Sequence, residues 1–412
     1  MDGGLKALRE TYANLNFRLY AFGNLSASVG LWIQRIGIGW LTWELTHSTA
    51  WLGGIALAEA IPSLVLALFA GAVVDRIDYF RLMRITQFCS LSYAVVISAL
   101  AFGDLIGIWT LFFLTMLRGV VIAFNRPSRM TLVYALVGRD MLAPALAVNS
   151  IIFNASRFIG PAVGGLIITS GGIAWSFAAS AALFLIFTLL LAAMKVTPHM
   201  PQGGRASLGS ETLAGVRYVW SHQGIRLQLA LLIAISLLAK PLTDMLPGFS
   251  GKVFDLGAHG LAILLTVHGL GAMLGALWVA SRSHGLDGLT VVSISSALAI
   301  AVSVMLFIAT DIFWIACPLV GLVSFFFIVQ SVANQTLIQS AVDPSLRGRV
   351  MSLYGMILEG VPSVGALLIG GLAEHWGLRL PLLFGALICL AAWFWAWRNR
   401  QAMEMAPLAD PR

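Results

Sequence analysis

The sequence predicts an all-α membrane protein whose twelve transmembrane helices form two similar halves of six. Three observations predict this fold class: a very apolar composition, a series of apolar stretches long enough to cross a bilayer, and an internal resemblance between the halves. Hydrophobic residues make up 59% of the 412 residues and charged residues only 10%, whereas roughly a quarter of the residues of a water-soluble chain are charged. The composition therefore excludes an ordinary soluble domain.

The apolar stretches have the length of membrane-spanning helices. A helix needs about 20 residues to cross a hydrocarbon core about 30 Å thick. The stretches are rich in Leu, Ala and Gly and do not alternate in polarity, so helices are favoured over a barrel. Twelve spans are predicted, at 18–43, 51–74, 84–103, 106–126, 144–170, 173–194, 226–249, 257–281, 288–310, 312–335, 349–372 and 377–398.

The cations predict the orientation. If both termini are cytoplasmic, nineteen of the 25 Lys and Arg residues fall in inside segments and only Lys252 and Arg379 outside. Such an excess is typical of cytoplasmic loops. It also accounts for the net charge of +7, so no nucleic-acid partner is expected.

A polar stretch and an internal repeat predict the domain organisation. The stretch 195–225 contains Gly, Pro and Ser and divides six spans from six. The pattern Pro-x-Val-Gly-x-Leu-x-Ile at 161–168 reappears at 362–369, and Thr131-Leu132 reappears as Thr336-Leu337. The matches lie in the same order at nearly half the chain length, which favours a duplicated six-helix unit. We expect bundles at 1–194 and 226–412, joined by a cytoplasmic linker.

Sequence features of enzymes and metal proteins are absent. The chain has no phosphate-binding loop, no HExxH pattern and no EF-hand loop. Its three cysteines, Cys89, Cys317 and Cys389, lie in apolar runs and predict neither a disulfide framework nor a metal site. We expect no enzyme activity, no cofactor and no metal.

The segment after the second predicted span carries the clearest pattern. It reads Gly71-Ala-Val-Val-Asp75-Arg76, with Arg81 five residues further on. This pattern resembles the loop between spans 2 and 3 of the major facilitator superfamily. The resemblance implies two six-helix bundles that expose a central cavity to each side of the membrane in turn.

The same resemblance implies a cytoplasmic gate. In the superfamily, the acidic residue at the position of Asp75 closes this gate by facing the start of span 11. A carboxylate near a helix start gains from the helix dipole and from charge-assisted hydrogen bonds. Here Arg347 and Arg349 lie at that helix start. The chain departs from the usual pattern at Asp78 and Tyr79, so Arg81 or Arg84 has to replace a missing basic residue.

The fifth predicted span contains a second superfamily pattern. Gly160-Pro161 followed by Gly164-Gly165 resembles the antiporter pattern of drug and metabolite exporters. A Gly-Pro pair weakens the helical hydrogen-bond ladder, and glycines spaced by four let another helix approach closely. Close packing alone is the alternative interpretation.

Further strings resemble one bacterial branch of the superfamily, which contains the enterobactin exporter and macrolide efflux proteins. They are Gln34 in the first span, Arg157-x-x-Gly160-Pro161, and Arg347-Gly-Arg349-Val-Met-Ser352. The resemblance covers nearly the whole chain. It implies efflux across the bacterial cytoplasmic membrane, with both termini inside.

Five charges fall within predicted spans and are the candidates for coupling or cargo recognition. A charge at mid-membrane costs at least about 2.5–3.5 kcal/mol, so it usually faces a cavity or a partner. A carboxyl in such surroundings favours its protonated form, as proton exchange requires. In the alternative interpretation, Glu59 and Glu359 permanently neutralise two of the arginines and have a structural role. The candidates are Arg35, Glu59, Arg118, Arg157 and Glu359.

Two further charges, Lys240 and Asp244, lie four residues apart on one helix and could pair with each other. Pro241 and Pro247 predict a break in this seventh span. Four intramembrane cations against three acids leave the interior slightly positive, which weakly favours an anionic or amphipathic cargo.

Together these patterns predict a secondary active transporter that exports a small amphipathic or anionic solute in exchange for protons, as a monomer in the lipid bilayer. Two alternatives stay open: an importer or lipid mover on the same fold, and a membrane scaffold or sensor that transports nothing.

Overall fold

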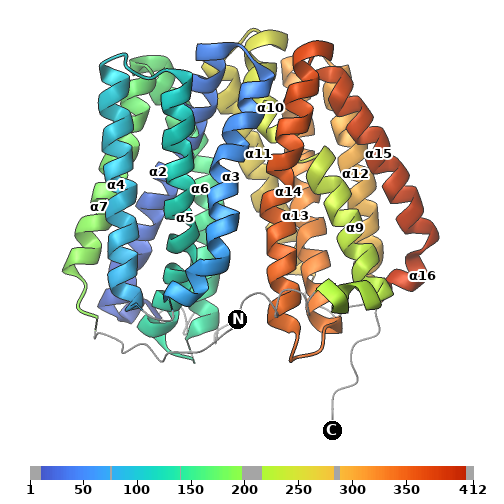
Figure 1. Ribbon diagram of the computed structural model, residues 1–412, viewed down its shortest axis with the longest axis horizontal. Coiled ribbons are helices and arrows are strands. Elements are labelled where there is room, and N and C mark those ends of the chain that lie inside the picture. Colours follow the sequence, from blue (N-terminus) through green and yellow to red (C-terminus); the bar gives the residue numbers. More distant parts are fainter. Residues whose placement is uncertain (1–10, 75–76, 140, 197–215, 283–287, 405–412) are drawn as a thin grey trace. The chain divides into compact units, whose positions relative to one another are not determined.

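The computed structural model describes residues 11–74, 77–139, 141–196, 216–282 and 288–404, and over these residues it contains helices and no strand. Figure 1 shows the helices along the chain. In order they are α2 (Leu15–Thr46), α3 (Thr49–Val74), α4 (Tyr79–Phe102), α5 (Ile108–Val137), α6 (Leu142–Gly171), α7 (Ile173–Ala193), α9 (Gln223–Leu238), α10 (Leu242–Gly248), the π-helix η1 (Phe249–Val253), α11 (Gly257–Ser281), α12 (Leu289–Ala309), α13 (Phe313–Ala341), α14 (Arg347–Trp376), α15 (Arg379–Arg398) and α16 (Arg400–Met403).

The predicted class, an all-α membrane protein, is confirmed. Within the described segments, eleven helical stretches are long and apolar enough to cross a membrane. The first predicted span, 18–43, coincides with α2, which has 32 residues. Helix α2 is not among the eleven stretches, and it carries Asn24, Gln34 and Arg35 among its hydrophobic residues.

The seventh predicted span is interrupted. Helix α9 ends at Leu238 and α10 begins at Leu242. Between them Leu242 N donates to Ala239 O at 3.2 Å and Thr243 N donates to Lys240 O at 3.1 Å. Each of these bonds reaches back three residues, as in a tight turn, instead of the four of an α-helix. Pro241 has no N–H to donate, so the regular ladder cannot pass through it. The predicted break therefore lies at Pro241.

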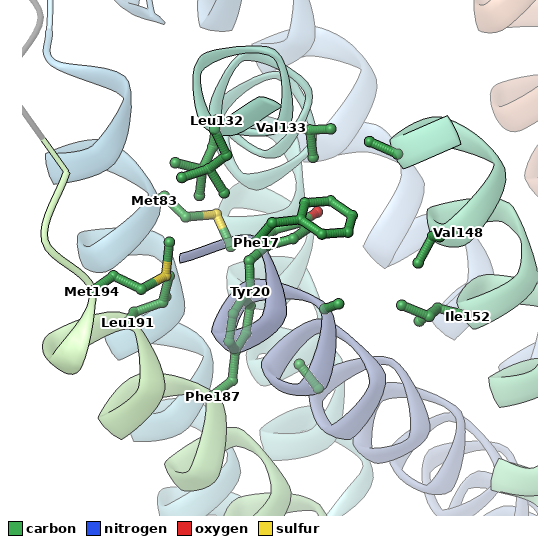
Figure 2. Close-up of a cluster of buried hydrophobic side chains, with 14 of the residues drawn as sticks. Phe17, Tyr20, Met83, Leu132, Val133, Val148, Ile152, Phe187, Leu191 and Met194 are labelled. Atoms are coloured by element: carbon green, nitrogen blue, oxygen red, sulfur yellow. The ribbon is translucent and has the colours of Figure 1, made fainter. Parts of the chain in front are cut away.

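By the contacts of its Cα atoms, the chain divides into two compact units. The first contains residues 1–46, 58–206 and 261–266. Its helix α2 packs against α6 and α7, and α4 packs against α5 and α7. Figure 2 shows part of its core, where Phe17 and Tyr20 of α2 lie beside Phe187 and Leu191 of α7, all nearly or completely buried.

The second unit contains residues 47–57, 207–260 and 267–412. Helix α12 packs against α13 and α15, and α14 packs against α9. The start of α3 belongs to this unit, whereas the rest of α3 belongs to the first. The predicted bundle boundaries, 1–194 and 226–412 with a linker at 195–225, stay a prediction.

Candidate functional site

The first unit contains an ion pair inside predicted membrane spans. Arg118 of α5 donates to the Glu59 carboxylate of α3. The Arg118 side chain is 7% exposed and the Glu59 side chain 28% exposed. The two helices meet closely because residue 119 is glycine: a Cβ there would collide with the carbonyl oxygen of Glu59. Proton exchange with Glu59 would change the net charge of this site.

Two other candidate arginines meet at one indole ring. Arg35 of α2 and Arg157 of α6 place their Cζ atoms 5.4 and 5.7 Å from the ring centroid of Trp32. The ring of Phe153 lies edge-on to the same indole, with 6.2 Å between centroids. We call Trp32, Arg35, Phe153 and Arg157 the arginine–tryptophan cluster. Trp32 was not expected from the sequence, and its spacing of three residues from Arg35 is the signal that could have indicated it.

Repulsion between the two arginines acts against their cation–π contacts with Trp32. Because both Cζ atoms lie within 6 Å of one centroid, the two charges are at most about 11 Å apart and repel by ~1.5 kcal/mol or more at an effective dielectric constant of about 20. Each cation–π contact contributes about 0.5–2 kcal/mol.

The glycines of the fifth span bring α6 against α2. A Cβ at Gly160 would collide with Trp32 Cβ, and a Cβ at Gly164 would lie 2.8 Å from Ile36 Cγ2. Pro161 lies inside α6, which continues to Gly171. A Cβ at Gly165 would collide with Ala262 Cβ. The pattern thus lies at helix contacts, and its role in flexing the span stays a prediction.

In the second unit a lysine at the break before α10 bonds to α14. Lys240 Nζ donates to the carbonyl oxygen of Leu358 on α14 at 2.9 Å and lies 4.9 Å from the centroid of the Phe327 ring. Glu359 follows Leu358 directly and is exposed. The lysine therefore lies beside the backbone of the candidate carboxyl, and the coupling role of Glu359 stays a prediction.

A buried histidine lies next to the same break. His268 of α11 is 7% exposed, and its Nε2 lies 3.2 Å from Thr243 Oγ1 on α10. Imidazole is the side chain that most readily exchanges a proton near neutral pH. His268 was not predicted as a candidate, because the candidates were chosen among Asp, Glu, Lys and Arg. The signal that could have indicated it is a histidine inside the apolar run 257–281.

The start of α3 is capped by a carboxylate from α14. Glu374 Oε2 accepts hydrogen bonds from Thr49 N at 3.0 Å, Ala50 N at 3.3 Å and Ser48 Oγ at 2.9 Å. Thr49 Oγ1 also donates to Gly370 O at 2.8 Å. The first turn of α3 has no acid of its own, so Glu374 supplies the negative charge that a helix start favours. We call this contact the α3–α14 clasp.

Part of the predicted cytoplasmic gate falls outside the described residues. Gly71 belongs to α3 and Arg81 to the first turn of α4, whereas Asp75 and Arg76 fall outside the described residues. Arg347 begins α14 and Arg349 follows within its first turn. The gate therefore stays a prediction.

Two acids near the predicted gate have structural roles. Asp78, which replaces the usual glycine, caps α4 by accepting from Arg81 N at 2.7 Å. Asp343 precedes α14 and accepts from Ser345 N and Ser345 Oγ at 2.8 and 2.6 Å. The side-chain and then the backbone hydrogen bond of Ser345 lower the pKa of the Asp343 carboxyl. Asp343 is therefore ionised at neutral pH beside the start of α14.

Matching positions of the two units carry polar side chains that bond to other helices. Arg129 of α5 donates to Asn24 Oδ1 at 2.6 Å and to Asn125 Oδ1 at 3.2 Å. In the second unit Asn334 lies 205 residues after Arg129, and Ser293 Oγ donates to its Oδ1 at 2.6 Å. The first unit thus has a half-buried charge where the second buries a neutral amide. Over the described residues no cluster of His, Cys, Asp and Glu could hold a metal.

Comparison with known proteins agrees with this architecture. Residues 10–408 match the family described as transmembrane secretion effector, a family of the major facilitator superfamily. The chain belongs to this family. It is therefore a multi-pass membrane transporter of small-molecule solutes and not an enzyme.

Relatives with assigned cargo match along most of their length. The chain is 27% identical to the staphyloferrin A transporter of Staphylococcus aureus over 85% of this chain and 87% of that protein. It is 28% identical to the multidrug efflux pump Tap of Mycolicibacterium fortuitum, over 89% and 91% of the two chains. It is 25% identical to the enterobactin exporter EntS of Escherichia coli O1:K1, over 89% and 85%.

Solved structures share the fold. The nucleoside transporter NupG superimposes with a TM-score of 0.70 at 13% identity, covering 95% of this chain and 99% of NupG. A bacterial homolog of the human lysosomal transporter Spinster superimposes with a TM-score of 0.67 at 14% identity, covering 99% of both chains.

Proposed function

We propose that the protein exports a small amphipathic or anionic solute across the bacterial cytoplasmic membrane in exchange for protons. Both termini lie in the cytoplasm in this proposal, and a monomer completes the cycle. The relatives named above are a siderophore transporter, a drug efflux pump and a siderophore exporter, which supports efflux of organic solutes.

The observation that carries proton exchange is the Glu59–Arg118 pair. The Glu59 side chain is 28% exposed and the Arg118 side chain 7% exposed. Water, and protons with it, therefore reaches Glu59 more readily than it reaches Arg118. Protonation of Glu59 leaves a buried guanidinium without its counter-charge, which is costly inside a protein. Proton binding at Glu59 therefore changes the stability of the contact between α3 and α5, which links the proton to the conformational cycle.

A second carboxyl completes the proposed coupling. Glu359 lies on α14, one residue after the carbonyl that Lys240 contacts. A proton on Glu359 changes the charge beside the break between α9 and α10. Discontinuous helices are the usual place for cargo and ion sites in transporters.

Alternation between the two sides needs contacts that form on one side and break on the other. On the cytoplasmic side we assign this role to Asp75 with Gly71, Arg76, Arg81, Arg347 and Arg349. At the other end of α14 we assign it to the α3–α14 clasp, in which Glu374 caps α3. Each carboxylate stabilises a helix start only while the two elements stay in contact.

The test compares both directions of transport. Drugs and siderophores from a panel are added to inverted and to right-side-out vesicles that carry the protein. Their uptake into the vesicles is followed under an imposed pH gradient. Export predicts solute accumulation only in inverted vesicles with an acidic lumen. Accumulation only in right-side-out vesicles would support the importer alternative, and no flux of any solute would support the scaffold alternative.

A further inference from the structure

We propose that a pocket between the end of α14 and the start of α15 binds the phosphate group of an anionic phospholipid. The pocket has a volume of about 410 Å³, and its lining includes Lys252, Asp311, Trp376 and Arg379. All four residues belong to the second unit. The proposal goes beyond the proposed function, because it concerns the membrane around the protein and does not depend on what is transported.

The pocket lies at the ends of membrane spans, which is the level of the lipid headgroups. One candidate span ends at Val253, another ends at Trp376, and the next begins at Arg379. Asp311 precedes the span that begins at Phe313. The end of a span marks the boundary of the hydrocarbon core, and the polar headgroup region begins there. The ligand at hand for this pocket is therefore a lipid headgroup.

The charges of the lining residues favour a ligand with one negative charge. Arg379 and Asp311 form an ion pair, so their charges balance. Lys252 is exposed and forms no ion pair with any described residue. Asp255 is also exposed, but it is not among the residues that line the pocket. The lining thus holds two cations against one acid, and the single charge of a phosphodiester balances it.

The hydrogen-bond donors suit the oxygen atoms of a phosphate. Arg379 uses Nη2 for its contacts with Asp311 Oδ1 and with Thr310 O. Its Nε and Nη1 have no acceptor within the described part of the chain. Guanidinium groups pair with phosphate through parallel hydrogen bonds, and the ammonium of Lys252 adds three further N–H donors. Arg379 can therefore donate to a phosphate while it keeps its ion pair.

Trp376 favours a lipid over a soluble anion. It is 55% exposed, and tryptophan is enriched where hydrocarbon meets headgroups. A lipid bound here places its phosphate near the cations and its glycerol and upper acyl chains near the indole. Lys252 and Arg379 are also the two cations that the sequence predicts on the outer side, and they line the same pocket although they lie far apart in the sequence. In the proposed orientation, the lipid lies in the outer leaflet.

The experiment measures which lipid occupies the pocket in nanodiscs that carry the full chain. A fluorescent bimane label is attached in Leu380→Cys, because Leu380 is 47% exposed and follows Arg379 directly. The exposed Cys89 is replaced first. Discs of dioleoylphosphatidylcholine contain an increasing fraction of phosphatidylglycerol or phosphatidylcholine with a nitroxide near the top of one acyl chain. Nitroxides quench bimane at short range, so the two quenching curves give the relative association of the two lipids.

Variants assign the preference to the pocket. We expect phosphatidylglycerol to associate about fivefold more tightly than phosphatidylcholine, which is the effect of one cation near a membrane surface. Lys252→Gln should make the two lipids equivalent, and Lys252→Arg should keep the preference because it keeps the charge. Asp311→Asn should increase the preference, because it removes an acid from the lining. Lys195→Gln is the matched control and should change nothing, since Lys195 is exposed and does not line the pocket.

Defined outcomes overturn the proposal. Equal quenching by the two lipids in the wild type removes the anionic preference, and an unchanged preference in Lys252→Gln removes the pocket as its cause. A weaker preference in Asp311→Asn contradicts the assigned charge balance. Glycerophosphoglycerol is the same headgroup without acyl chains, and if an excess of it abolishes quenching by phosphatidylglycerol, the pocket takes a soluble anion and not a lipid. Because the measurement involves no transport, these outcomes leave the proposed function to the vesicle assay.

Discussion

Removal of the Glu374 carboxylate should loosen the α3–α14 clasp. In Glu374→Ala the donors Thr49 N, Ala50 N and Ser48 Oγ lose their shared acceptor. Loss of a helix N-cap costs about 0.5–2 kcal/mol, and a negative charge at a helix start contributes about 0.3–1 kcal/mol. Because Glu374 is exposed, the lower end applies. We expect the clasp to lose roughly 1 kcal/mol of stability, which increases the fraction of molecules with an open clasp about fivefold.

Spin labels measure that fraction. Gly54 of α3 and Leu368 of α14 are suitable positions, since a Cβ at Gly54 approaches only Trp51 and Leu368 is 52% exposed. The exposed Cys89 is replaced first. Double electron–electron resonance in nanodiscs should show a larger population at long distance in Glu374→Ala than in the wild type.

A matched variant controls for loss of an acid. Asp311 is exposed and forms an ion pair with Arg379 in the same unit. Asp311→Asn should leave the distance distribution unchanged. Identical distributions for Glu374→Ala and the wild type would refute the reasoning, because the carboxylate would then contribute nothing to the contact.

Three further predictions concern single contacts. Glu59→Gln leaves Arg118 without its counter-charge and should lower the thermal unfolding midpoint by an amount equivalent to about 1–3 kcal/mol; a double-mutant cycle with Arg118→Met measures the coupling energy, and a value of zero would contradict the pair. Gly160→Ala should destabilise by about 1–3 kcal/mol through collision with α2, while the matched Gly355→Ala, which meets no atom within 4 Å, should not destabilise; equal melting of both variants would exclude the close contact. Thr243→Val removes the contact between Thr243 Oγ1 and His268 Nε2, so the ¹⁵N chemical shift of His268 Nε2 at one fixed pH should change, and an unchanged chemical shift would separate the histidine from α10.

The fold was largely predictable because it depends on composition and length. Apolar stretches must form helices in a bilayer, so the spans were found from hydropathy alone. Helix ends were less predictable: α5 continues to Val137 although the predicted span ends at residue 126. Its polar last turns pack inside the first unit, where Arg129 bonds to Asn24, and a hydropathy criterion ends a span at such residues.

The candidate site was predictable only as single residues. The cost of burying charge singled out Glu59 and Arg118 separately, but their pairing depends on the approach of α3 to α5, which needs Gly119. Helical spacing relates residues of one helix and contains no information about a neighbour in another. For this reason the meeting of Arg35 and Arg157 at Trp32 emerged only from the structure.

Glu374 shows a different limit. It lies at the end of a span, where acids are common and have no special meaning. Its role follows from Ser48 and Thr49, which begin a helix without a local acid and so need one from elsewhere. That need is visible in the sequence, but the helix that meets it is not.

Proton exchange itself is tested most directly in proteoliposomes that contain the purified protein, a transported solute and a pH gradient as the only ion gradient. The account predicts that the gradient drives solute against its concentration, and that Glu59→Gln still binds the solute but loses this response. Solute accumulation in Glu59→Gln at the rate of the wild type, or wild-type transport that ignores the gradient, would contradict it.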